Sequence, residues 1–103
     1  MNEAIATIKN TRRIQAQYDV HAKKAFGQNF IIEPKVVEKI ADAAIASPND
    51  LVIEVGPGIG ALTQFLCEKS EHVVAFEIDE RLPDILRAEI GSDHLEILLQ
   101  DFL

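Results

Sequence analysis

The sequence has a single cysteine, Cys67, and no apolar run that approaches the roughly 20 residues needed to cross a bilayer. One cysteine cannot form an internal disulfide, which is typical of a protein from a reducing compartment. The first ten residues also lack the basic and then apolar order of a secretory signal peptide. We therefore expect a cytoplasmic protein with no membrane association.

Groups that could hold a metal or act as a nucleophile are also scarce. The three histidines (His21, His72 and His94) are scattered without the spacing of metal ligands, so no metal site is expected. No Ser/His/Asp or Cys/His set stands out for nucleophilic catalysis. Cys67 falls in a predicted apolar helix and is interpreted as a packing residue.

Charge is unevenly distributed along the chain. The net charge is −7, but residues 1–24 carry five basic groups against two acids, for +3, and residues 25–103 carry −10. This pattern is typical of a basic arm on an acidic body. Arg12, Arg13, Lys23 and Lys24 are therefore candidates for contacts with nucleic-acid phosphates, although a merely solvated tail fits the charge count equally well.

What the sequence does contain is centred on Leu51–Gly60, LVIEVGPGIG. A nearly continuous apolar run is typical of a strand buried on both faces. Gly56, Gly58 and Gly60 then predict a tight turn whose backbone can approach a ligand closely. Helical periodicity follows from Ala61, and strand, glycine turn and helix together indicate a cofactor site in an α/β sheet.

The remaining elements follow in the order expected for such a sheet. A short helix is predicted over 12–17 with Thr11 as its N-cap, and a longer one begins at Pro34. Periodicity then predicts strands at 51–55, 73–76 and 95–99, with helices over 61–69 and 82–90 between them. The sequence therefore predicts an α/β fold: a partial Rossmann-like sheet of three parallel strands in the order 3-2-1, with flanking helices.

Polar residues follow the predicted strands, where open α/β sheets bind ligands. Glu77 ends the second strand and lies 21 residues after Gly56, the separation at which an acid can reach ribose hydroxyls. Gln100 and Asp101 end the third strand, and Asp101 fits adenine recognition and a plain turn equally well.

The nature of the cofactor depends on the glycine turn. The spacing Gly56-x-Gly58-x-x-Ala61 also fits a dinucleotide site, so an NAD-binding oxidoreductase domain remains an alternative. Glu54 places negative charge beside the turn, and Pro57 removes one backbone N–H that could bind a phosphate. Both features favour a cationic ligand such as S-adenosylmethionine. If Glu54 points into the protein instead, it needs a buried partner.

Four motifs in this order resemble one family. They are Phe26–Phe30 (FGQNF), Glu54–Thr63 (EVGPGIGALT), Ala75–Asp79 (AFEID) and Gln100–Asp101. Together they are similar to the ribosomal RNA adenine N6,N6-dimethyltransferases, from about Ile5 to the end of the chain. Macrolide-resistance 23S rRNA methyltransferases look similar and remain an alternative, but Gly27 favours the small-subunit enzymes.

The resemblance implies a substrate, a cofactor and site residues. The substrate would be two adjacent adenosines near the 3′ end of 16S rRNA, each methylated twice at N6 by S-adenosylmethionine. Asn29 and Ile31 would contact the methionine part of the cofactor, and Glu77 would bind the ribose. The candidate cofactor-binding residues are Gln28, Asn29, Ile31, Glu54, Gly56, Gly58, Glu77, Ile78, Gln100 and Asp101.

One departure from the family concerns catalysis. The family's Asn-Leu-Pro-Tyr-type motif has no counterpart in these residues, so no catalytic residue is assigned. We therefore expect residues 1–30 to form a basic arm and cofactor-covering loop, and residues 31–103 the first half of the methyltransferase domain. The chain alone would be inactive and would self-associate through its exposed sheet edge. A non-enzymatic RNA-binding module is the remaining alternative.

Overall fold

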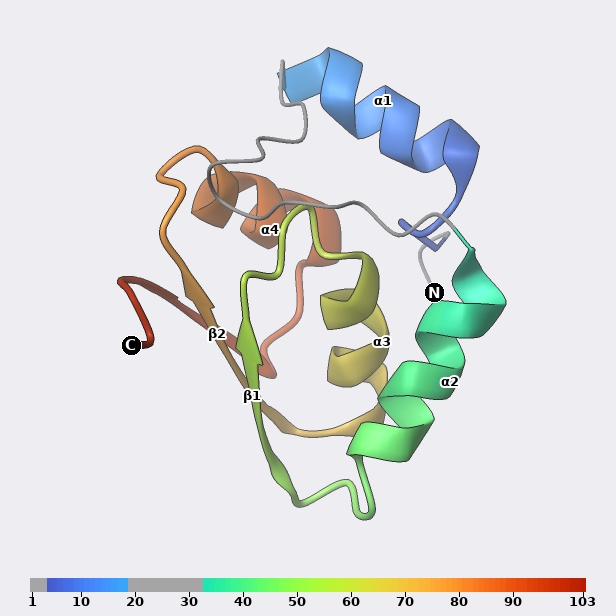
Figure 1. Ribbon diagram of the computed structural model, residues 1–103, viewed down its shortest axis with the longest axis vertical. Helices are drawn as coiled ribbons and strands as arrows, with labels where there is room; N and C mark the ends of the chain where they lie inside the picture. Colours follow the sequence, from blue (N-terminus) through green and yellow to red (C-terminus); the bar gives the residue numbers. More distant parts are fainter. Residues whose placement is uncertain (1–3, 19–32) are drawn as a thin grey trace.

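The computed structural model describes residues 4–18 and 33–103, which form one sheet with helices packed on it (Figure 1). The three strands are parallel, and β1 and β3 are its edges. This confirms the predicted strand order. The elements in chain order are α1 (Ile8–Tyr18), α2 (Pro34–Ala44), β1 (Leu51–Val55), α3 (Ala61–Lys69), β2 (His72–Glu77), α4 (Leu82–Ile90) and β3 (Leu95–Leu99).

The helix boundaries follow from local chemistry. Pro34 occupies the first position of α2, where its missing N–H costs nothing, and the Glu33 side chain accepts a hydrogen bond from the Lys35 backbone. Gly91 ends α4 in the left-handed conformation, at a φ of 59°. None of the described helices is long and apolar enough to cross a membrane.

The predicted start of the first helix is wrong. The helix begins at Ile8 rather than Arg12, because Thr7, not Thr11, caps it: the Thr7 hydroxyl accepts from the Asn10 backbone N–H at 3.0 Å. Thr11 lies inside the helix, where its hydroxyl donates to the Ile5 carbonyl. Both threonines have the right chemistry for a cap, and the preceding bend decides between them.

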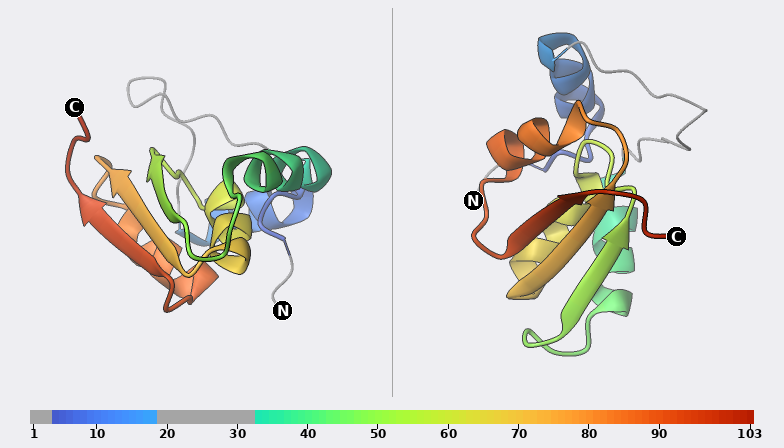
Figure 2. Two further views of the ribbon diagram at one scale, coloured as in Figure 1. Left: turned by 90° about the horizontal axis from the view of Figure 1, so that it is seen from below. Right: turned by 90° about the vertical axis from the view of Figure 1, so that its left-hand side faces the viewer.

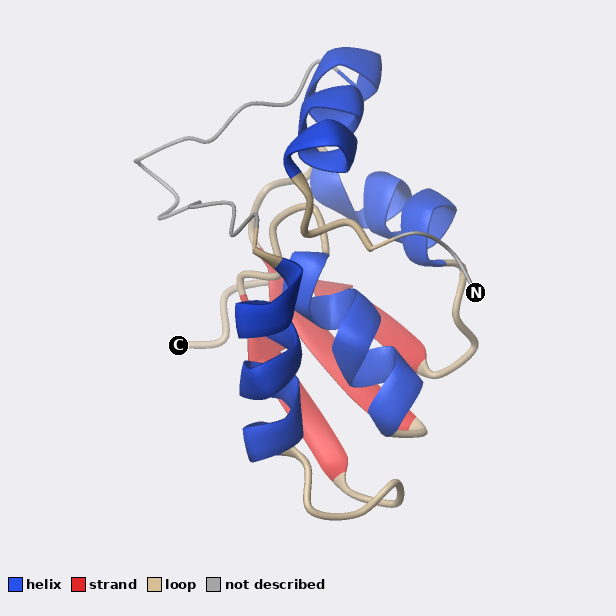
Figure 3. Ribbon diagram, turned by 90° about the vertical axis from the view of Figure 1, so that its right-hand side faces the viewer, coloured by secondary structure: helices blue, strands red, loops and turns tan. Residues whose placement is uncertain are grey.

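The helices α2, α3 and α4 cover one face of the sheet, as the opposite views in Figures 2 and 3 show. On that face Val52 and Val73 are buried. On the other face of β1, Leu51, Ile53 and Val55 are 65%, 50% and 60% exposed. The expectation that β1 is buried on both faces is therefore wrong for the described structure, since no described helix covers its second face.

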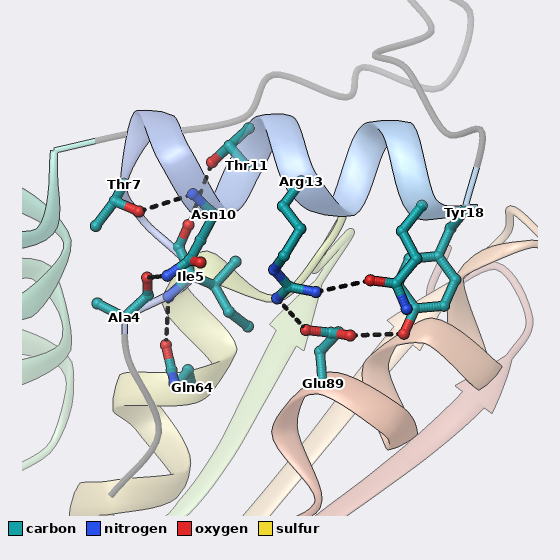
Figure 4. Close-up of polar contacts among 10 residues, drawn as sticks. Ala4, Ile5, Thr7, Asn10, Thr11, Arg13, Tyr18, Gln64 and Glu89 are labelled. Atoms are coloured by element: carbon teal, nitrogen blue, oxygen red, sulfur yellow. Dashed lines mark hydrogen bonds and ion pairs between the residues drawn. The ribbon is translucent and has the colours of Figure 1, made fainter.

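The N-terminal segment packs against the body of the protein rather than extending from it. Ile5, Ala6 and Ile14 have at most 2% of their surface exposed and belong to the same core as Leu82 and Leu86. Polar contacts reinforce this packing, and Figure 4 shows them along α1. Residues 4–18 are thus anchored by apolar side chains, which their charge alone did not indicate.

Candidate functional site

The carboxyl ends of the three strands meet at one edge of the sheet. The register pairs Val55 with Phe76, and Glu77 with Leu99. The glycine turn, Ile78 and Gln100 therefore follow neighbouring strands at the same end of the molecule, toward which β1 points in Figure 1. This is the position at which open α/β sheets bind ligands.

The glycine turn has an open side and a packed side. Gly56 has a φ of 69°, and a Cβ added there would meet no atom within 4 Å. Its N–H donates to the Phe76 carbonyl at 2.8 Å, which fixes the turn to β2. Gly60, at a φ of 95°, packs against α4 instead. The turn is therefore fixed to β2 and packed against α4. The side of Gly56 on which a Cβ would stand is open to a ligand.

Backbone groups hold the carboxylate of Glu77 in place. The residue is 2% exposed, and one of its oxygens accepts from the N–H groups of Ile78 and Asp79 at 2.8 and 2.9 Å. The other oxygen accepts from the Gly58 N–H at 3.4 Å, which is long for a hydrogen bond, so this oxygen is the more weakly bound of the two. Since the side chain is already oriented, a hydroxyl pair could bind it with little loss of entropy.

Glu54 points into the protein, and its partner is Thr63 of α3. The Thr63 hydroxyl, which is fully buried, donates to Glu54 Oε1. Burial raises the pKa of the Glu54 carboxyl from 4.5 to about 7; the Thr63 hydrogen bond lowers it, and the charge of Glu77 raises it. The buried partner required by the alternative interpretation of Glu54 is therefore present. Sequence reasoning assigned no role to Thr63, although it lies within the glycine motif.

The remaining predicted cofactor residues of the described structure lie at the surface of this edge. Ile78 is 50% exposed, an apolar side chain directly after Glu77. Gln100 and Asp101 are exposed, and Asp101 Oδ1 accepts from the Leu103 N–H at 2.9 Å. Phe102 packs its ring edge-to-face on Phe76, with centroids 5.0 Å apart. This edge of the sheet therefore carries both apolar and polar side chains.

The basic residues of α1 differ in their surroundings. Arg12 is exposed, whereas Arg13 forms an ion pair with Glu89 of α4 (Figure 4). Arg13 is thus engaged in holding α1 to the body. Lys23, Lys24, Gln28, Asn29 and Ile31 lie outside the described residues, so the predictions for them stay predictions.

Comparisons with known proteins identify the family of this chain. A family described as ribosomal RNA adenine dimethylase matches residues 20–103. Ribosomal RNA small subunit methyltransferase A of Pediococcus pentosaceus is 47% identical over 90% of this chain and 32% of its own length. The chain spans about a third of the length of the curated relatives that it matches.

Two solved structures share the fold. The 23S rRNA methyltransferase ErmE superimposes with a TM-score of 0.66 and 37% identity, covering 72% of this chain and 31% of that one. A dimethyladenosine transferase from Plasmodium falciparum gives a TM-score of 0.60 and 30% identity, covering 68% of this chain and 26% of that one. Both likenesses extend over the greater part of the chain.

Proposed function

Because the chain belongs to the ribosomal RNA adenine dimethylase family, we propose that it is the S-adenosylmethionine-binding part of an rRNA methyltransferase. The observation that carries the proposal is the oriented Glu77 carboxylate beside the open space above Gly56. The cofactor supplies a methyl group activated by a sulfonium sulfur. The residues of this chain bind and orient the cofactor.

Each described site residue has a distinct part in this proposal. Glu77 accepts hydrogen bonds from the ribose hydroxyls, which would replace its long contact with the Gly58 N–H. Ile78 supplies an apolar surface for the adenine, and Asp101 with Gln100 frames its polar edge. Gly56 lies beneath the methionine part, where any side chain would occupy the space that the cofactor needs.

The substrate that the family implies is adenosine N6 in small-subunit RNA, at two adjacent positions near the 3′ end of 16S rRNA. The Pediococcus pentosaceus relative is named for the small subunit and is 47% identical, whereas ErmE, named for 23S rRNA, is 37% identical. These relatives favour the proposal over an NAD-binding oxidoreductase. An enzyme of this kind works where ribosomes are assembled, so the proposal places the chain in the cytoplasm.

RNA contacts and self-association complete the proposal. Arg12, exposed on α1, is available to a phosphate, and Lys23 and Lys24 are proposed to add to this basic surface. The exposed apolar residues of β1 favour association of two chains through this edge of the sheet. Two residues of α2, Val36 and Ile40, are also exposed apolar side chains.

The test is calorimetric binding of S-adenosylhomocysteine to the wild type and to Glu77→Ala. Loss of charge-assisted hydrogen bonds that together contribute about 1.5–3 kcal/mol should weaken binding roughly tenfold to a hundredfold. Glu80→Ala, which removes a neighbouring exposed carboxylate, should leave the affinity unchanged. Equal affinities for wild type and Glu77→Ala would refute the role of Glu77, and binding of NAD alone would refute the choice of cofactor.

A further inference from the structure

Asp79 follows Glu77 by two residues, and its backbone N–H is one of the two that bind the better-held oxygen of the Glu77 carboxylate. The Asp79 side chain is itself almost buried, with 4% of its surface exposed. A buried carboxylate is costly without charged or polar donors around it. Whatever holds the Asp79 side chain therefore also helps to fix the direction of its backbone N–H.

Arg81 supplies donors to both oxygens of Asp79. The guanidinium Nε lies 2.9 Å from Asp79 Oδ1 and 3.1 Å from Oδ2, and a terminal guanidinium nitrogen also donates to Oδ2. The Arg81 backbone N–H adds a hydrogen bond to Oδ1 at 3.0 Å. Because the guanidinium is planar and its donors form a rigid fork, such a contact fixes the orientation of the carboxylate as well as pairing its charge.

The short segment that contains this contact is anchored at both ends. Glu77 is the last residue of β2 and pairs with Leu99 of β3. At the other end, the Leu82 N–H donates to the Asp79 carbonyl at 3.1 Å, and Leu82, the first residue of α4, is fully buried. The contact between Arg81 and Asp79 lies between these points. It therefore acts on the backbone that carries the N–H groups bound by Glu77.

A second arginine of α4 provides a comparison. Arg87 pairs with Asp84 at 3.4 Å, and the Asp84 side chain is 98% exposed. An exposed pair of this kind contributes little to stability or geometry. Asp79 is buried, so loss of the Arg81 guanidinium would force its carboxylate to move or to change its contacts.

We propose that Arg81 is a positioning residue: by holding Asp79, it holds the N–H groups that orient Glu77 toward the two ribose hydroxyls. This inference rests on the proposed function. Glu77 touches the ribose, whereas Arg81 acts through Asp79. Two hydroxyls bind one carboxylate only when its plane is correctly oriented. Arg81 thus determines how well the site distinguishes a ribose from a sugar that lacks these hydroxyls.

The experiment measures, by calorimetry, the affinities for S-adenosylhomocysteine and for its 2′,3′-dideoxy analogue, which lacks both ribose hydroxyls. The wild type should prefer S-adenosylhomocysteine roughly tenfold or more. Arg81→Ala should reduce this preference to about threefold or less, because the analogue makes no hydrogen bond to Glu77 and loses little. Arg87→Ala, which removes the exposed arginine of the same helix, should keep the preference of the wild type.

A purely structural role for Arg81 would weaken both ligands by the same factor, so an unchanged preference in Arg81→Ala would overturn the inference. If Arg81→Ala does not fold, Asp79→Asn provides the test, since it keeps the size of the side chain but places an NH₂ group against the guanidinium. Its preference should fall in the same way, and a full preference would overturn the inference.

Amide hydrogen exchange gives a second readout, in the ligand-free chain. The Ile78 and Asp79 amides should exchange faster in Arg81→Ala than in the wild type or in Arg87→Ala, because their acceptor Glu77 is less well aligned with them. Equal exchange rates in the three proteins would also overturn the inference.

Glu77→Ala separates this inference from the proposed function. It should bind S-adenosylhomocysteine and the dideoxy analogue with nearly equal affinity. A full preference in Glu77→Ala, or a wild type that binds neither ligand, would overturn the proposed function and the inference with it. A preference lost in Glu77→Ala but kept in Arg81→Ala would overturn the inference alone.

Discussion

Arg13 and Glu89 are 76 positions apart in the sequence, yet a guanidinium nitrogen of Arg13 lies 2.5 Å from Glu89 Oε1. The second oxygen of Glu89 accepts from the Tyr18 hydroxyl at 2.5 Å. One acidic side chain on α4 therefore holds two residues of α1 that are five positions apart (Figure 4). At the other end of this segment the Ile5 N–H donates to Gln64 of α3 at 2.7 Å.

The first prediction concerns this contact between α1 and α4. A double-mutant cycle of Arg13→Ala and Glu89→Ala in urea unfolding should give a coupling of about 0.5–1 kcal/mol, modest because the Arg13 side chain is 45% exposed. The same cycle on Arg87 and Asp84, an ion pair at 3.4 Å with side chains 59% and 98% exposed, is the control and should show almost none. Equal coupling in the two cycles would mean that Glu89 does not anchor α1.

The second prediction concerns Gly60, which approaches α4 closely. A Cβ there would lie 2.8 Å from side-chain atoms of Leu86 and Ile90, at a φ of 95°. Gly60→Ala should cost about 2–4 kcal/mol, from backbone strain and overpacking together. Gly91→Ala, whose Cβ meets only a carbonyl oxygen at 3.9 Å, should cost about 1–2 kcal/mol from strain alone. Similar losses of stability for the two variants would show that α4 moves to accommodate the added methyl group.

The third prediction is a pH dependence of stability. Folding raises the pKa of Glu54 from 4.5 to about 7, chiefly through burial, so between these values the folded chain binds the extra proton. The contribution of Glu54 to the free energy of unfolding therefore falls as pH rises from 4.5 to 7. Glu54→Gln stays neutral at every pH and still accepts a hydrogen bond from Thr63. As pH rises from 4.5 to 7, its free energy of unfolding should therefore increase relative to that of the wild type by up to about 3 kcal/mol. Urea unfolding at several pH values measures this, and parallel curves would contradict it.

The fourth prediction is self-association through β1. Sedimentation velocity should show dimers or larger species as concentration rises, because Leu51, Ile53 and Val55 form an exposed apolar edge without lysine or proline. Ile53→Lys should keep the chain monomeric. Glu96→Lys, exposed on the same face of β3 but away from the β1 edge, should not. A wild type that remains monomeric at high concentration would show that this edge does not self-associate.

The fifth prediction separates the two arginines of α1. Arg12→Ala should weaken RNA binding and reduce the slope of log affinity against log salt by about one, as expected for one lost phosphate contact. Arg13→Ala should act mainly on stability, through its ion pair with Glu89. An unchanged salt slope in Arg12→Ala would remove this residue from the RNA-binding surface.

Most element boundaries could be predicted because their causes are local. The strand, glycine turn and helix of residues 51–69 depend on apolar periodicity and on glycines that tolerate positive φ, at Gly56, Gly58 and Gly60. The start of α1 could not be chosen in this way, because Thr7 and Thr11 are equally good caps and the bend at residues 5–7 decides. The open face of β1 was also missed, since an apolar run predicts burial without saying what covers it.

The candidate site likewise has features that the sequence predicts and features that depend on the tertiary structure. The sequence by itself determined which chemical groups end the strands and that Glu77 follows Gly56 at the spacing of a ribose acceptor, because strand and turn lengths count residues directly. Only the tertiary structure decided that Glu54 meets Thr63, that three backbone N–H groups orient Glu77, and that Arg13 is engaged by Glu89. Such pairs depend on how separate elements pack, and a hydrogen bond depends on tenths of an ångström that no local pattern specifies.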